Sequence, residues 1–102
     1  MNFGLEKKTC DRIAAVFASY AHLEKVILYG SRAMGTYHRG SDIDLTLVGD
    51  KIDLDTANDI ALKLDELMLP YSIDLSVFAR IQNPELRDHI NRRGVVFYAA
   101  SN

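Results

Sequence analysis

The stretch GSRAMGTYHRGSDIDL, residues 30–45, decides which fold and function we expect of this chain. It opens with a Gly-Ser pair and ends on the first residues of the apolar run IDLTLV, residues 43–48. Strands disfavour aspartate, so two aspartates at alternate positions here require a reason. Because side chains alternate across a strand, Asp42, Asp44 and Thr46 should share one face, and the apolar residues between them the other.

The tripeptide Ile-Asp-Leu occurs again at residues 73–75. In a further strand, Asp74 would therefore point to one face and its apolar neighbours to the other. If both apolar faces pack on helices and the two strands are neighbours, Asp42, Asp44 and Asp74 converge on the open face. Like charges on one sheet face are destabilising, and no lysine or arginine occupies a nearby strand position. We considered solvated strand aspartates as the alternative, but the matching register of the third aspartate argues against it.

Carboxylate oxygens are the donors that Mg²⁺ or Mn²⁺ prefers over zinc. Asp42 and Asp44 are two residues apart, roughly 6.6 Å along a strand. Their carboxylates can therefore reach a pair of metals about 3.5–4 Å apart, the spacing of two-metal phosphoryl-transfer sites. We predict Asp42, Asp44 and Asp74 as catalytic residues and metal ligands.

The Gly-Ser pair is a candidate phosphate site. Gly30 ends an apolar strand, where exposed main-chain amides favour a phosphate and glycine allows it to approach closely. The hydroxyl of Ser31 can donate a further hydrogen bond. A P-loop is excluded because Thr36 stands where that motif requires lysine, and a nucleophile elbow is excluded because Ser31 lacks the G-x-S-x-G frame.

Hydrophobic periodicity predicts helices and strands in alternation along the chain. We expect helices at residues 5–21, 55–68 and 84–93, a short helix or turn at 31–37, and strands at 24–29, 41–48, 71–78 and 95–98. Asp55 and Asn83 are the expected N-caps, and Gly94 the expected C′ residue. The pattern predicts one α+β domain over residues 1–102, a mixed sheet with helices packed on one face.

Composition and charge argue against a nucleic-acid-binding, membrane-bound or disulfide-stabilised protein. Twelve basic and 14 acidic side chains give a formal charge of −2, which provides no field for steering nucleic acid or anionic membranes. Cys10 is the only cysteine, so no intrachain disulfide forms and a reducing cytoplasm is expected. We find neither a signal-peptide core nor an apolar run of transmembrane length. His22 and His89 are expected at the surface, without metal-ligand spacing between them.

Gly-Ser, ten residues, then Asp-x-Asp is the signature of the polymerase-β-like nucleotidyltransferase superfamily. The chain resembles its minimal nucleotidyltransferase (MNT) domains, of the HEPN/MNT toxin–antitoxin type. The resemblance runs over nearly the whole chain, through the third aspartate, Asp74, to the closing segment RRGVVFY, residues 92–98. Many relatives read GSRARG, with a second arginine where this chain has Met34.

The resemblance implies transfer of AMP from ATP to a hydroxyl acceptor, with pyrophosphate released. Asp42 and Asp44 would hold two Mg²⁺ or Mn²⁺ ions, and Asp74 would complete the site as a ligand or as the base. Three further residues, Gly30, Ser31 and Arg32, would bind the nucleotide phosphates.

The resemblance also implies a partner. Larger members carry a second domain for the acceptor, and this sequence ends a few residues after its last expected strand. We therefore expect the acceptor to be a separate HEPN-domain protein encoded by a neighbouring gene, adenylylated on a tyrosine, in a homo- or hetero-oligomer. Two alternatives stay open: a binding module that neutralises its partner by contact alone, and a small-molecule nucleotidyltransferase of the aminoglycoside type.

Overall fold

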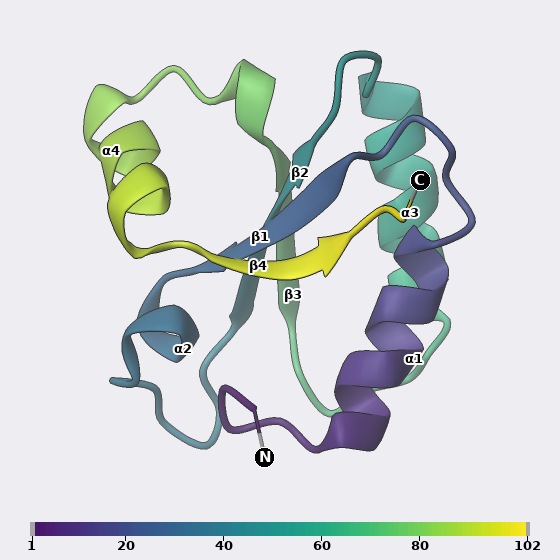
Figure 1. Ribbon diagram of the computed structural model, residues 1–102. Helices are drawn as coiled ribbons and strands as arrows, with labels where there is room; N and C mark the ends of the chain where they lie inside the picture. The colour runs from purple at the N-terminus through teal and green to yellow at the C-terminus, as the bar shows by residue number, and fades with distance from the viewer. Residues whose placement is uncertain (1, 102) are drawn as a thin grey trace.

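The computed structural model describes residues 2–101 and contains a four-stranded mixed sheet with four α-helices (Figure 1). The strands lie in the order β3-β2-β1-β4; β1 pairs antiparallel with β2 and β4, and β2 runs parallel to β3. The predicted α+β class is confirmed. In chain order the elements are α1 (Lys7–Phe17), β1 (Lys25–Tyr29), α2 (Ser31–Met34), β2 (Ile43–Val48), α3 (Leu54–Asp65), β3 (Ile73–Val77), the 3₁₀ turn η1 (Phe78–Arg80), α4 (Pro84–Arg93) and β4 (Val95–Ala99).

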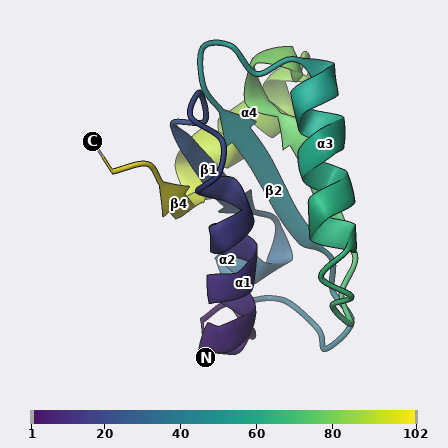
Figure 2. The same ribbon diagram turned by 90° about the vertical axis from the view of Figure 1, so that its right-hand side faces the viewer.

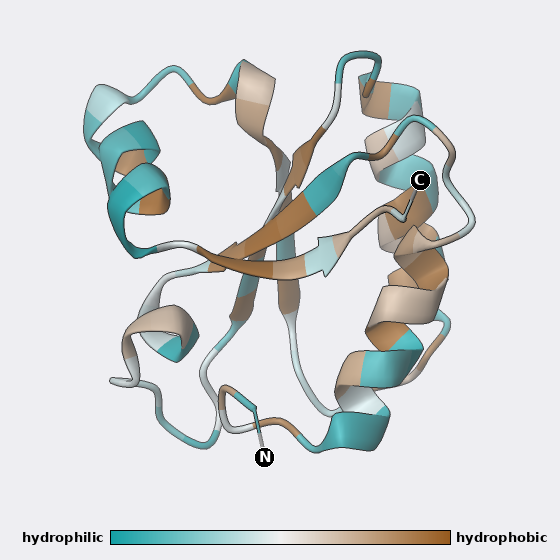
Figure 3. Cartoon of the chain, in the orientation of Figure 1, coloured by the Kyte–Doolittle hydropathy of each residue, from teal (hydrophilic) through white to brown (hydrophobic). Residues whose placement is uncertain are grey.

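The two long helices α1 and α3 cover one face of the sheet, as predicted (Figure 2). Their inward residues pack on alternate residues of the central strands, and brown marks the hydrophobic residues of helices and strands alike in Figure 3. The fully buried members of this core include Ile13, Phe17, Val26, Leu28, Ile43, Leu45, Leu47 and Ile60. Burial of this apolar surface is the main term that stabilises the fold. Within residues 2–101 no helix is long and apolar enough to cross a membrane.

Helix α4 contacts β1 from the opposite side of the sheet (Figure 1). Ile90 is buried there, and Gly94 ends the helix. We predicted Gly94 as a C′ residue, for which the left-handed conformation is typical, but its backbone is extended, with φ −66° and ψ 148°. The glycine is needed for another reason: a Cβ atom would overlap the carbonyl of Ile90 and the side chain of Ile27. Close packing of α4 on β1 therefore explains this glycine.

The N-cap of α3 differs from the prediction. Asp53, rather than Asp55, accepts a hydrogen bond from the amide of Thr56 at 2.8 Å, and this bond lowers the pKa of Asp53. Asp55 lies in the first turn, where the helix dipole favours a negative charge. The N-cap of α4 is the predicted Asn83, which accepts from two backbone amides.

Candidate active site

The prediction that the Ile-Asp-Leu segments at residues 43–45 and 73–75 lie on neighbouring strands is confirmed. Strands β2 and β3 are adjacent and parallel, and Asp44 lies directly opposite Asp74 in the register. Neighbouring strands are about 4.8 Å apart, so the two carboxylates project side by side from one face. On its other side Asp44 pairs with Tyr29, the last residue of β1. The site is therefore built on the central strand β2 and the edge strand β3, next to the end of β1.

The remaining aspartate, Asp42, lies outside the regular strands. Asp42 lies one residue before β2 begins and is exposed, as is Asp74, whereas Asp44 is half-buried. Burial raises the pKa of Asp44, and the negative charges of Asp74 and Asp42 raise it further. The negative charges of the other two carboxylates therefore act on Asp44.

The donor set fits a divalent cation. In the described part of the chain, no three acidic, histidine or cysteine side chains form a ready-made metal cluster. The carboxylates of Asp42, Asp44 and Asp74 are nevertheless all oxygen donors, which Mg²⁺ and Mn²⁺ prefer. A cation would also offset the repulsion that raises the pKa of Asp44. Because Asp42 precedes the strand, its exposed side chain can turn toward the other two.

Gly30 connects the carboxylates to the candidate phosphate site. Its φ of +77° and ψ of −156° belong to a conformation that only glycine adopts readily. A Cβ atom at this position would overlap the carboxylate of Asp44. Strand β1 therefore ends with bare main chain against Asp44, and Ser31 follows as the first residue of the single-turn helix α2.

Arg32 is buried, with 2% of its surface exposed. Its Nε and Nη2 donate to the backbone oxygen of Ser41 at 3.2 and 2.9 Å, and its Nη1 donates to that of Phe3 at 2.8 Å. The guanidinium lies 5.3 Å from the ring centre of Tyr37 and 5.0 Å from that of Tyr71. In this arrangement Arg32 joins the N-terminal turn to the loop that carries Asp42. Its role in phosphate binding stays a prediction.

His89 is the site residue that the sequence analysis missed. We expected it at the surface, but its Nε2 accepts a hydrogen bond from the amide of Gly30 at 3.2 Å, and its ring meets Tyr29 edge-on at 6.3 Å. His89 also opposes the rise in the pKa of Asp44. One signal was available: His89 is three residues after Leu86, so it shares the inward side of α4.

Comparison with known proteins agrees with this geometry. Residues 11–102 match the family described as "Polymerase beta, Nucleotidyltransferase". A protein of Methanocaldococcus jannaschii, described as a candidate protein adenylyltransferase, is 35% identical over 82 residues, which are 79% of this chain and 76% of the relative.

Two solved structures share the fold. One is a toxin–antitoxin complex with AMP-PNP, with a TM-score of 0.72, 23% identity, and coverage of 90% of this chain and 74% of the matched chain. The other is a complex of tri-AMPylated Shewanella oneidensis HEPN toxin with MNT antitoxin, with a TM-score of 0.68, 17% identity, and coverage of 94% and 74%.

Proposed function

This chain belongs to the polymerase-β nucleotidyltransferase family, and from that premise we propose that it transfers AMP from ATP to a tyrosine of a HEPN-type toxin in the cytoplasm, as an antitoxin. The observation that carries the proposal is the pairing of Asp44 with Asp74 beside the bare main chain of Gly30. The candidate adenylyltransferase of M. jannaschii and the toxin–antitoxin complexes of the same fold support this choice of acceptor.

The carboxylates of Asp42, Asp44 and Asp74 would hold two Mg²⁺ or Mn²⁺ ions. When bound, such ions neutralise the charge that develops on the transferred phosphoryl group. Gly30 and Ser31 would bind the triphosphate through their main-chain amides and the serine hydroxyl. The hydrogen bond from Gly30 to His89 already uses one of these amides, so the nucleotide must displace the imidazole to reach it.

The exposed position of Asp74 on an edge strand suits a role in proton transfer. The acceptor oxygen forms a bond to the α-phosphorus, and the bond from that phosphorus to the bridging oxygen of the β-phosphate breaks. Pyrophosphate leaves, and the hydroxyl proton passes to Asp74. Asp44, half-buried beside Gly30, stays in place during the transfer, while Arg32 holds the loop before Asp42.

The test is incubation of the chain with labelled ATP, Mg²⁺ and the protein encoded by the neighbouring gene. We expect an adduct of about 329 Da, the mass of one transferred AMP unit from its formula, on a tyrosine of that protein. Asp74→Asn should stop the labelling while the two proteins still co-purify. The matched control is Asp50→Asn, which removes a carboxylate from an exposed turn after β2. If the partner is silenced without an adduct, and Asp74→Asn silences it equally, neutralisation is by contact alone.

A further inference from the structure

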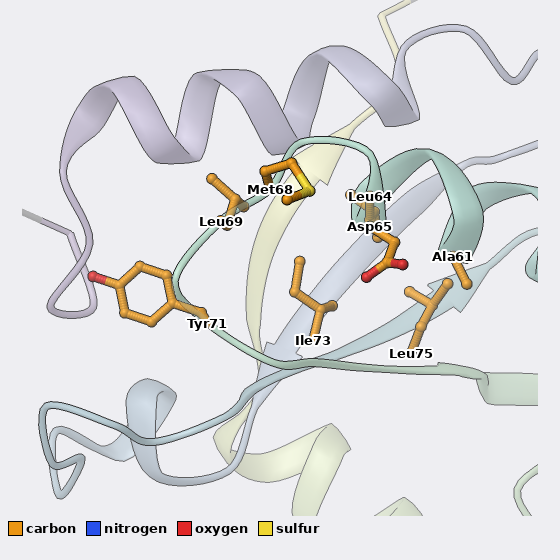
Figure 4. Close-up of a pocket in the computed structure, with 8 residues that line it drawn as sticks. All are labelled: Ala61, Leu64, Asp65, Met68, Leu69, Tyr71, Ile73 and Leu75. Carbon is orange, nitrogen blue, oxygen red and sulfur yellow. The ribbon is translucent and has the colours of Figure 1, made fainter.

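A groove lined mostly by apolar side chains runs between α3 and β3, on the sheet face opposite the aspartates. It consists of two hollows of about 300 and 240 Å³ that share Ala61 and Leu75, and we call it the β3 groove. Figure 4 shows Ile73 and Leu75 pointing from the strand toward α3, with Tyr71 at one end. Because the small side chain of Ala61 forms part of the wall, the groove remains open along the strand.

Strand β3 is an edge strand whose partner is β2. The carbonyl of Ser72 accepts from the amide of Ile43 in β2. Peptide groups alternate between the two sides of a strand, so those of Ile73 and Leu75 point away from β2. No strand within residues 2–101 pairs with this side. An extended chain satisfies such a row of donors and acceptors, whereas a helix does not.

A chain paired with β3 would contact both faces of the sheet. Its side chains would alternate between the β3 groove and the face that carries Asp74 and Asp44. A residue opposite Asp74 would present its side chain to the carboxylates, while its two neighbours would enter the groove. This alternation connects acceptor binding to the proposed chemistry.

We infer that the β3 groove binds an extended segment of the acceptor protein, in which the hydroxyl-bearing residue lies between two apolar residues. This inference rests on the proposed function and specifies its substrate class.

Charge at the two ends of the groove adds a further requirement. Asp65 lines the end near Ile73 and Arg80 the end near Val77, and neither takes part in an ion pair within the described residues. The segment therefore carries a basic side chain toward Asp65 and an acidic one toward Arg80.

The probe is the labelled peptide Lys-Ser-Leu-Tyr-Leu-Ser-Glu, in which the charged residues and the leucines share the face opposite the tyrosine. Its reversed sequence is also used, so that parallel and antiparallel pairing are both covered. Binding is measured by fluorescence anisotropy without ATP. Ala61→Arg fills the groove from an exposed helix position and should weaken binding of the preferred peptide at least tenfold. The control Leu62→Arg adds the same side chain at the next residue, which is 64% exposed and outside the groove, and should bind as the wild type does. In antiparallel pairing the two leucine amides face β3, whereas in parallel pairing the tyrosine amide does, so methylation of the corresponding amides should abolish binding of the preferred peptide.

Transfer is then measured with labelled ATP and the same peptide. We expect a KM for the peptide raised at least tenfold in Ala61→Arg, with the KM for MgATP unchanged. If the peptide binds as expected but neither it nor the partner protein gains AMP, the proposed function fails and the groove assignment stands. If neither peptide binds, or Ala61→Arg binds equally well, the groove assignment is overturned whatever the transfer result. It is also overturned if the wild type is a dimer that Ala61→Arg dissociates and no peptide binds, because a second copy then occupies the groove.

Discussion

Replacing Asp44 by asparagine should stabilise the fold while abolishing transfer. Two unit charges about 4.8 Å apart, the spacing of paired strands, repel by about 1 kcal/mol in water and about 3 kcal/mol at a dielectric constant of 20. Asp44 is half-buried and Asp74 is exposed, so the lower value applies. For a domain of this size, about 1 kcal/mol raises Tm by about 4–8 °C.

The assay is thermal unfolding of Asp44→Asn at neutral pH with EDTA, repeated with Mg²⁺. The pKa of Asp44 is raised in the folded state, so the folded protein binds more protons than the unfolded chain. Its stability therefore falls as pH rises through the interval from the ordinary aspartate pKa, about 4, to the raised value. The increase in Tm caused by Asp44→Asn should be complete at neutral pH and disappear below about pH 4. It should become smaller when Mg²⁺ offsets the repulsion.

A double-mutant cycle gives the control. Asp74→Asn removes the same repulsion, so the double variant should be less stable than the sum of the single effects predicts. Asp50→Asn, in the turn after β2, should leave Tm unchanged. If Asp44→Asn lowers Tm in EDTA at neutral pH, or if the two substitutions add fully, the carboxylates do not repel one another and the site assignment loses its electrostatic basis.

Three other substitutions test separate parts of the structure. Gly30 has a backbone conformation that alanine adopts only with strain, and a Cβ atom there would overlap Asp44. Gly30→Ala should therefore lose MgATP binding and destabilise the fold by about 1–3 kcal/mol. Turnover equal to that of the wild type would show that the phosphates bind elsewhere. Met34 is 46% exposed, so Met34→Arg should leave Tm unchanged. It should lower the KM for MgATP about two- to fivefold, because one exposed charge contact contributes that much. An unchanged KM would show that residue 34 does not contact the phosphates. The buried hydroxyl of Thr46 has no hydrogen-bond partner among the described residues. Thr46→Val should therefore raise the free energy of unfolding, measured in urea, by about 1 kcal/mol. A lower free energy of unfolding would show that the hydroxyl has a partner.

The paired aspartates could be predicted because two local patterns agree. Alternation in each Ile-Asp-Leu segment fixes the face of Asp44 and Asp74, and burial of the apolar residues between them fixes the register of the strands. The adjacency of β2 and β3, which are distant in the sequence, does not follow from either pattern and comes from the structure.

The contacts of His89 and Arg32 could not be predicted in the same way. The position of His89 on the inward side of α4 is visible in the sequence, but the side of the sheet that α4 covers depends on how Gly94 packs on β1. Arg32 binds the backbone oxygens of Phe3 and Ser41, and a sequence does not show where the carbonyls of distant loops lie. The cap of α3 was misplaced by two residues because both Asp53 and Asp55 are good capping residues, and which one caps depends on where the first turn begins.

The contacts of Arg32 have a practical consequence for expression of the protein. The same guanidinium holds Phe3, near the start of the chain, and Ser41, the residue before Asp42. A purification tag or fusion partner attached ahead of Phe3 would pull on this turn and, through Arg32, on the loop that carries Asp42, one of the carboxylates proposed to be catalytic. Loss of activity in such a fusion would then be an effect of its attachment point. Measurements of turnover should therefore use a protein whose tag is at the other end or has been cleaved.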